Sequence, residues 1–309
     1  MSRTVRTGTR RVGLSSRSGI TRALYALHGR NPSGSVREVR RRLDTELVRR
    51  GLAVSRARAV AEIEAGRVVV AGAPASKGAT LVDPAQPITI LGPPPRFVGR
   101  GGEKLDAALE RFRLDVTGRR CLDAGASTGG FTDCLLQRGA AEVVAADVGY
   151  GQLHEKLRRD PRVVVRERTD VRSLGLDDVG GGAEVVVADL SFISLRHVLP
   201  SLFSLAAPGA PLVPLVKPQF EAGRREADRG RGVVRDPVVW RRVLEEIVVA
   251  VEEAGAAIMG AMASPLTGAA GNVEFLLHVV APDGRLPPQA AANVDLDAVV
   301  AEACRRHGG

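Results

Sequence analysis

Between residues 100 and 281 the sequence alternates short apolar runs with amphipathic stretches, and this alternation restricts the fold more than any other feature. The apolar runs predict buried strands, and the amphipathic stretches predict helices. Strands that are apolar on both faces and alternate with helices form a parallel sheet that is covered by helices on both sides. We therefore expect an α/β fold here. The expected strands are 120–126, 141–149, 162–170, 183–192, 210–220 and 271–282, and the expected helices are 131–139, 151–160, 197–209 and 237–255.

Residues 41–91 have a different pattern, which predicts a small α+β domain. A helical repeat runs to Gly51, which is a typical C-terminal cap residue, and Ser55 is a typical N-cap for a second helix. Gly66 ends that helix, and "RVVVAG" then predicts a strand that enters a turn. Two helices and a small sheet with exposed arginines suit RNA binding, but a small solvated domain fits the same spacing.

The remaining segments complete the expected domain organisation. Residues 1–40 contain nine Arg and one Glu, and we expect a basic, disordered tail. An organellar transit peptide, a true start further downstream and attraction to nucleic-acid phosphates are alternative readings of this tail. Residues 92–99 contain three consecutive prolines and form a linker, residues 100–283 form the α/β domain, and residues 284–309 form a C-terminal extension with a short amphipathic helix.

Charge and cysteine content restrict the class of protein further. The net charge is +9, of which +8 lies in residues 1–40, so the rest of the chain is nearly neutral. Three widely spaced cysteines give neither a disulfide framework nor a metal site, so we expect a cytoplasmic protein without a metal. No apolar run reaches the length of about 18 residues that a membrane span needs, so no membrane partner is expected. We expect the free protein to be a monomer.

The segment "LDAGASTGGF" (122–131) predicts a strand, a glycine-rich turn and a helix, which is where α/β sheets bind nucleotide-like ligands. Acidic residues end three successive strands: Asp123, Asp147 and Asp170. An acid about 20 residues after the glycines suits ribose hydroxyls, and an acid on the next strand can meet an adenine amino group. One or two of these acids could instead only cap the following helices.

This pattern favours an adenosine ligand without a pyrophosphate, and hence S-adenosylmethionine rather than NAD. The glycine spacing also differs from that of dinucleotide binders. The candidate cofactor-binding residues are Asp123, Gly125, Ser127, Gly129, Gly130, Phe131, Asp147, Asp170 and Asp189.

Lysine is rare in this chain, and that makes two lysines informative. Of the 44 Lys and Arg residues only four are lysines, and Lys217 follows an apolar strand directly, at the same sheet edge as Asp189. Lys104 is expected just before the first helix of the α/β domain, and Glu274 on its last strand. A surface charge at a helix start would explain Lys104 equally well, but explains Lys217 less well. Lys77 is expected in a turn and Lys156 on a solvated helix.

These four residues suggest methylation of a hydroxyl group. A ribose 2′-hydroxyl is a poor nucleophile, and Arg cannot deprotonate it because the guanidinium keeps its proton. A lysine can act as a base when burial or a second cation disfavours its charged form. Lys217 is then the candidate base, Lys104 tunes it, and Asp189 and Glu274 hold the two lysines. Carbon methylation through a cysteine fits less well, because no cysteine lies at a strand end. Amino methylation also fits less well, since "ADLSF" lacks the Pro-Pro turn of such enzymes.

Several motifs together resemble the TlyA family of bacterial ribosomal RNA 2′-O-methyltransferases, whose members are often named hemolysins. They are "RLDTELVRRGLAVSRARAVAEIEAGRVVVAG", "GRGGEKL", "CLDAGASTGGFT", "VVAADVGYGQL", "VVADLSFISL", "LVKPQFE" and "ASPLTGAAGNVEF". The resemblance covers about residues 41–281. It implies an S4 RNA-binding domain at 41–91, followed by a Rossmann-like class I methyltransferase sheet with helices on both faces.

The family resemblance also implies a function and a set of site residues. The implied reaction transfers a methyl group from S-adenosylmethionine to cytidine 2′-hydroxyls of 16S and 23S rRNA in 30S and 50S subunits. The catalytic tetrad maps to Lys104, Asp189, Lys217 and Glu274. The RNA-contacting arginines are expected to be Arg41, Arg42, Arg56 and Arg58.

One segment departs from the family, and two rival functions remain. Actinobacterial members have an Arg-x-Trp-Val linker, whereas this chain has Phe97 in place of Trp and Gly99 in place of Ser. The first rival is an RNA-binding module with an inactive methyltransferase domain. It predicts no binding of S-adenosylmethionine, which calorimetry would test. The second is a membrane-active hemolysin, which needs an apolar span or a strongly amphipathic aromatic face that the sequence lacks.

Overall fold

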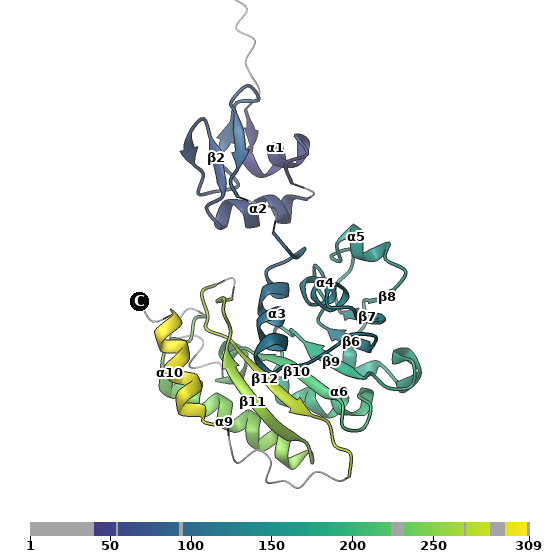
Figure 1. The fold of residues 1–309 in the computed structure, drawn as a ribbon. Coiled ribbons are helices and arrows are strands. Elements are labelled where there is room, and N and C mark those ends of the chain that lie inside the picture. The colour runs from purple at the N-terminus through teal and green to yellow at the C-terminus, as the bar shows by residue number, and fades with distance from the viewer. Residues whose placement is uncertain are drawn as a thin grey trace, which may run out of the picture. The chain divides into compact units, whose positions relative to one another are not determined.

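A computed structural model of the chain describes residues 40–53, 55–92, 95–223, 226, 232–268, 270–284 and 294–307 (Figure 1). The described residues form two compact units that divide between residues 93 and 94. The predicted tail, residues 1–40, lies outside the described residues except for Arg40. The expected spacer before the C-terminal helix lies outside them at 285–293.

The first unit is the small α+β domain that the sequence predicts. Its helices are α1 (Leu43–Arg49) and α2 (Arg56–Glu64), and its strands are β1 (Arg41–Arg42), β2 (Val68–Val70), β3 (Ala73–Pro74), β4 (Leu81–Val82) and β5 (Ile88–Ile90). The strands form a three-stranded sheet, β3-β2-β5, and a separate β1-β4 pair. The caps are those expected: Gly51 has a positive φ after α1, and the Ser55 side chain accepts a hydrogen bond from the Arg58 amide.

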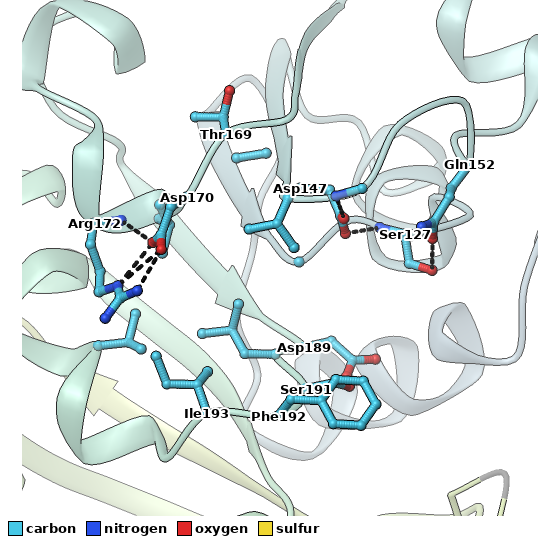
Figure 2. A pocket seen from close by; sticks show the side chains of 17 residues that line it. Ser127, Asp147, Gln152, Thr169, Asp170, Arg172, Asp189, Ser191, Phe192 and Ile193 are labelled. Carbon is cyan, nitrogen blue, oxygen red and sulfur yellow. Dashed lines mark hydrogen bonds and ion pairs between the residues drawn. The ribbon is translucent and has the colours of Figure 1, made fainter.

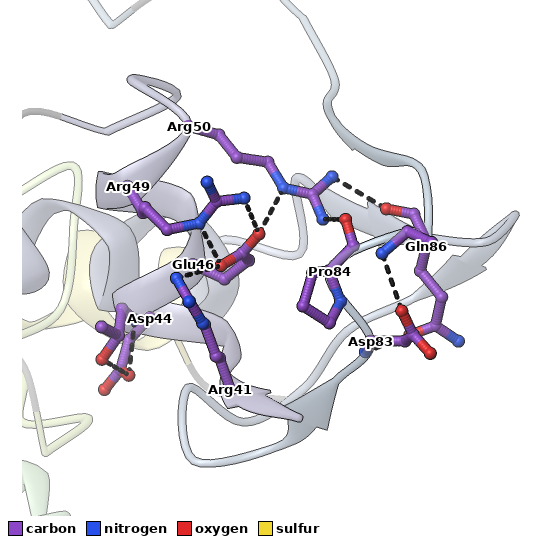
Figure 3. A network of polar contacts seen from close by, with 10 residues as sticks. Arg41, Asp44, Glu46, Arg49, Arg50, Asp83, Pro84 and Gln86 are labelled. Atoms are coloured by element: carbon purple, nitrogen blue, oxygen red, sulfur yellow. Dashed lines mark hydrogen bonds and ion pairs between the residues drawn. The ribbon is translucent and has the colours of Figure 1, made fainter. Parts of the chain in front are cut away.

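Buried carboxylates on α1 tie the small unit together (Figure 3). Glu46 is fully buried and accepts hydrogen bonds from the guanidinium groups of Arg49 (2.6 and 2.7 Å) and Arg50 (2.8 Å). Arg50 also donates to the carbonyl oxygens of Pro84 and Gln86, both at 2.8 Å. Arg49 holds the pKa of the Glu46 carboxyl down at about 2, so this anchor is ionised at every ordinary pH.

The second unit contains a seven-stranded sheet. Its strands are β6 (Arg120–Ala124), β7 (Glu142–Asp147), β8 (Val163–Glu167), β9 (Val185–Ala188), β10 (Pro211–Val216), β11 (Ala257–Ala263) and β12 (Phe275–Val280). Their order across the sheet is β11-β12-β10-β9-β6-β7-β8. Only β12 runs antiparallel to its neighbours, so the expectation of a fully parallel sheet was wrong at this edge.

The strand β11 was not predicted. Its sequence, "AIMGAMA", has one β-branched residue, Ile258, among Ala, Gly and Met, and it follows the helix Pro237–Glu253 almost directly. The strand β11 is stabilised by pairing with β12 and by the C-terminal helix, which packs against β11. The strand propensity of its residues alone would not predict it.

Helices cover both faces of this sheet, as predicted. They are α3 (Gly101–Arg111), α4 (Gly130–Gln137), α5 (Glu155–Arg158), α6 (Leu199–Leu205), α7 (Pro218–Glu221), α9 (Pro237–Glu253) and α10 (Leu296–His307), with 3₁₀ turns at Val171–Ser173, Leu176–Val179 and Leu195–His197. Alternate strand residues enter two separate cores: Leu122 and Val186 pack with α6 and α9, whereas Cys121 and Val185 pack with α3 and α4. The expected helix at 151–160 is a single turn, and α10 adds Val299 and Ala303 to the first core.

Candidate active site

Two adjoining cavities lie at the carboxyl ends of the parallel strands. The larger, about 550 Å³, is lined by residues that follow β6, β7, β8 and β9 (Figure 2). The smaller, about 210 Å³, is lined by Gly101 at the start of α3, the glycine-rich turn after β6, and Lys217 after β10. Gly125, Ser127, Asp189 and Ser191 line both cavities. A volume of this size suits a nucleoside-sized ligand, and we call the two the nucleoside cavity and the reaction cavity.

The glycine-rich turn is shaped by close packing. Gly125 has φ +86°, and a side chain there would place its Cβ 2.5 Å from the Asp189 carbonyl oxygen. Gly129 also has a positive φ, but its missing side chain makes room for Leu153 and Leu157 rather than for a ligand. Gly130 and Phe131 line the reaction cavity, whereas Gly129 lines neither cavity.

Asp147 and Asp170 both line the nucleoside cavity, but they differ in hydrogen bonding. The Asp147 carboxylate accepts bonds from the amides of Ser127 (2.8 Å) and Gly149 (2.6 Å), and each oxygen keeps a lone pair for a further donor. The Asp170 carboxylate instead accepts hydrogen bonds from one residue, Arg172: from its backbone amide, its Nε and its Nη2. These hydrogen bonds lower the pKa of the Asp170 carboxyl. Asp170 also caps the short turn that follows, which is the structural alternative noted from the sequence.

Asp123 lies beneath the turn and lines neither cavity. It is completely buried, and its Oδ2 accepts a hydrogen bond from the Thr132 hydroxyl at 2.6 Å, whereas its Oδ1 has no partner. Burial raises the pKa of this carboxyl to about 7, and the nearby Asp189 charge adds to the rise. The cofactor contact that we predicted for Asp123 stays a prediction, and the structure gives the residue a position behind the site.

Because its pKa is raised, Asp123 makes the free energy of unfolding depend on pH. In the unfolded chain an Asp carboxyl ionises near pH 4, whereas in the folded protein it keeps its proton up to about pH 7. The folded state therefore binds more protons between these values, and stability falls as the pH rises through this window. We expect Asp123→Asn to stabilise the protein by about 1–2 kcal/mol at pH 8, because it removes a buried charge but leaves one amide donor without a partner.

Urea unfolding of both proteins measures this difference. At pH 4 the advantage of Asp123→Asn should disappear or reverse, since the wild-type carboxyl is then neutral. An equal difference at pH 4 and pH 8 would contradict the assignment of a protonated Asp123.

Lys217 and Asp189 are brought together at the reaction cavity, as the sequence predicts. The Lys217 ammonium nitrogen lies 2.6 Å from Asp189 Oδ1 and donates a hydrogen bond to the Ser191 hydroxyl at 2.9 Å. The contact with Asp189 is an ion pair whose angle departs from that of a hydrogen bond, so Ser191 provides the directional bond. The Lys217 side chain is 11% exposed.

Lys104 and Glu274 form a second ion pair. Both side chains are buried, and the Lys104 ammonium donates to the Glu274 carboxylate. Lys104 lies within α3 and not before it, so the exposed helix-start charge considered from the sequence is wrong. The β10–β12 register ends at Val216 opposite Phe275, so Lys217 and Glu274 each lie one residue beyond the paired ends of these two strands.

Several cavity residues were missed in the sequence. Phe192 has a side chain that is 91% exposed and a φ of +65°, which is strained for a residue with a Cβ. Its ring packs 5.3 Å from that of Phe220, beside Lys217. Ser191, Gln152 and Arg172 also line the nucleoside cavity (Figure 2). Only their position in the sequence could have indicated them, because each shortly follows a strand end that carries a candidate acid.

The four arginines proposed for RNA binding are held by carboxylates of the small unit. Arg42 and Arg56 bond to the buried Asp44 at 2.8 and 3.1 Å, and Arg41 lies 4.0 Å from Glu46. The side chains of these three arginines remain about half exposed. Arg58 is largely covered and pairs with Glu62 at 2.8 Å, so the prediction that it lies exposed was wrong.

Two further observations narrow the chemistry. Cys121 and Cys134 are buried, and burial raises the pKa of each thiol to about 12, so neither supplies a nucleophilic thiolate. Within the described ranges, no helix has the length and apolar character needed to cross a bilayer.

Comparison with known proteins identifies the family. Residues 97–280 match the FtsJ-like methyltransferase family, and residues 41–88 match the S4 domain. The chain is 54% identical over 239 residues to the 16S/23S rRNA (cytidine-2′-O)-methyltransferase TlyA of Mycobacterium tuberculosis, which covers 77% of this chain and 89% of that protein. The chain belongs to the TlyA family of FtsJ-like methyltransferases.

Other relatives of this TlyA-family methyltransferase carry a different name. Hemolysin A of Brachyspira hyodysenteriae is 37% identical over 77% of this chain and 99% of its own length. A solved structure from Streptococcus thermophilus, also described as a hemolysin, is 37% identical, covers 86% of this chain and 96% of that chain, and superposes with a TM-score of 0.67. The resemblance, the enzyme class and the methyltransferase fold predicted from the sequence are thereby confirmed.

Proposed function

We propose that this methyltransferase transfers a methyl group from S-adenosylmethionine to the 2′-hydroxyl of cytidine in 16S or 23S rRNA within ribosomal subunits. The observation that carries the proposal is the Lys217–Asp189 pair at 2.6 Å, in a cavity that adjoins a nucleoside-sized cavity. The Mycobacterium tuberculosis relative is named for the same reaction. Such a substrate would place the enzyme in the cytoplasm.

The nucleoside cavity fits S-adenosylmethionine. Asp147 keeps lone pairs for ribose hydroxyls, and the exposed Val148 (73% exposed) and the partly buried Ile193 offer apolar surface for an adenine ring. The amides at the start of α4, beside Gly130, suit the carboxylate of the methionine part. When bound, this group supplies an electrophilic methyl on a sulfonium centre.

The residues of the reaction cavity would handle the proton of the attacking hydroxyl. An uncharged Lys217 amine would take the 2′-hydroxyl proton while the methyl group passes from the sulfonium sulfur, which is left as a neutral thioether, to the hydroxyl oxygen; Asp189 would then stabilise the ammonium that results. The buried Lys104–Glu274 pair would complete the proposed tetrad. The half-exposed Arg41, Arg42 and Arg56 contact phosphate groups of the RNA.

Labelled S-adenosylmethionine with unmodified 30S and 50S subunits tests the proposal. A 2′-O-methyl group blocks alkaline cleavage at its 3′ side, so a protected cytidine supports the proposal and maps its site. Label on a base with no protected nucleotide would refute it. Calorimetry with S-adenosylmethionine separately tests the rival of an inactive scaffold, which predicts no binding.

The exposed Phe192 ring offers a stacking surface for the target nucleotide. A base that leaves its helix for chemistry stacks on aromatic side chains, which contributes about 1–3 kcal/mol per base. We therefore expect Phe192→Ala to lower kcat/KM for the ribosomal subunit about 5- to 150-fold and to leave cofactor affinity little changed. Steady-state kinetics with varied subunit concentration measure this effect, and Tyr150→Ala, another exposed aromatic, serves as the comparison. Unchanged kcat/KM would exclude the stacking role.

A further inference from the structure

Ser191 lies where the two cavities meet. It follows β9 by three residues, lines both the nucleoside cavity and the reaction cavity, and accepts a hydrogen bond from Lys217 at 2.9 Å. Gly125, Ser127 and Asp189 also line both cavities, but Gly125 has no side chain and the Ser127 hydroxyl bonds to Gln152. Among these shared residues, only Asp189 and Ser191 therefore act on Lys217.

Asp189 and Ser191 act on Lys217 in different ways. The carboxylate lies close enough to attract the ammonium strongly, but its angle does not fix the direction of any N–H bond. The Ser191 hydroxyl has the geometry of a hydrogen bond, and a hydrogen bond is directional. The carboxylate therefore supplies charge, and the hydroxyl supplies orientation.

Orientation matters because a lysine that accepts a proton must aim its lone pair. An uncharged amine nitrogen has four tetrahedral directions: the Cε bond, two N–H bonds and the lone pair. One N–H bonds to Ser191, and the Asp189 carboxylate, 2.6 Å from the nitrogen, attracts the other. The lone pair then takes the remaining direction, in a side chain that lines the reaction cavity and is nearly closed to solvent.

We propose that Ser191 is a positioning residue that sets the direction of the Lys217 amine for proton transfer from the substrate hydroxyl. The inference rests on the proposed function, because it assigns Lys217 the role of base. During the reaction the O–H proton passes to the lone pair of Nζ, and the resulting ammonium keeps its hydrogen bond to Ser191. The Ser191 hydroxyl proton is not transferred.

Kinetics with three variants test the role of Ser191. We expect Ser191→Ala to lower kcat about 10- to 100-fold with little change in KM for S-adenosylmethionine, since misdirection of a reacting group can reduce rate by about 100-fold. Ser191→Thr keeps a hydroxyl at the same place and should restore most of the activity. Ser204→Ala removes an exposed hydroxyl from α6, away from both cavities, and should behave like wild type. Wild-type kcat in Ser191→Ala would overturn the inference.

A second measurement does not depend on catalysis. The chain has only four lysines, so ¹⁵N-labelled lysine gives few Nζ signals, and loss of one signal in Lys217→Arg assigns that of Lys217. We expect the Lys217 Nζ protons to exchange with water more slowly in wild type and Ser191→Thr than in Ser191→Ala. Equal exchange in all three proteins would overturn the inference. If wild type methylates no 2′-hydroxyl, the proposed function fails, and the exchange rates still decide whether Ser191 orients the amine.

Discussion

Lys217→Arg should abolish most methyl transfer and leave cofactor binding intact. Arginine keeps the positive charge beside Asp189, but its guanidinium does not give up a proton near neutral pH, so it cannot serve as a base. General base catalysis contributes about 10²- to 10⁴-fold, and we expect kcat to fall by that factor. Single-turnover transfer from labelled S-adenosylmethionine measures the rate, and calorimetry measures binding.

Controls separate the proton from the charge. Lys156→Arg makes the same substitution at an exposed lysine and should leave kcat unchanged. Lys217→Ala opens space at the reaction cavity, and a small primary amine added to the buffer should restore part of its activity, whereas guanidine should not. Wild-type turnover in Lys217→Arg would show that a positive charge at this position is sufficient.

Glu274→Leu should destabilise the protein by about 3–5 kcal/mol. It leaves the Lys104 ammonium without its carboxylate in a site where that side chain is only 9% exposed, and removing one partner of a buried pair has this effect. The double variant Lys104→Met/Glu274→Leu replaces both charges by apolar groups and should return to within about 1 kcal/mol of wild type. Methyl transfer should stay low in both variants, because each loses the Lys104–Glu274 ion pair of the proposed tetrad.

Tryptophan fluorescence during urea unfolding measures these stabilities. Trp240 is the single tryptophan of the chain, is buried, and packs edge-on against Phe275, next to Glu274. Glu155→Leu breaks an exposed ion pair with Arg159 and should change the stability by less than about 1 kcal/mol. A double variant as unstable as Glu274→Leu, or one with wild-type turnover, would contradict the assigned role of the pair.

The elements predicted correctly from sequence are those in which local pattern and tertiary context agree. Strands such as β6 and β9 are apolar on both faces, and helix ends at Gly51 and Ser55 carry standard capping residues. The element β11 was missed because its Gly and Met residues have no strand preference and gain it only from pairing. The direction of β12 was also missed, because an apolar segment has the same sequence pattern in a parallel and in an antiparallel strand.

The candidate site shows the same limit. Lys217 and Asp189 were placed correctly because both directly follow buried strands that run in the same direction. Lys104 was harder, because its burial depends on a carboxylate 170 residues away in sequence. The engagement of Arg58 by Glu62 and of Asp170 by Arg172 depends on side-chain geometry, which strand and helix patterns do not contain. Phe192 was missed because nothing in "ADLSF" indicates that its backbone turns the ring outward.

The Lys104–Glu274 pair also links catalytic readiness to the progress of synthesis. Lys104 emerges from the ribosome early, but its counter-charge follows 170 residues later, at a rate of about 5–20 residues per second. Until β12 has formed and paired with β10, a nascent chain has a lysine that water must solvate and a sheet that lacks its antiparallel strand. A fragment that ends before β12 would therefore retain the glycine-rich turn and Asp147 but would lack a closed core around Lys104. If this pair has the proposed catalytic role, the enzyme becomes competent only after nearly all of its methyltransferase unit has been translated.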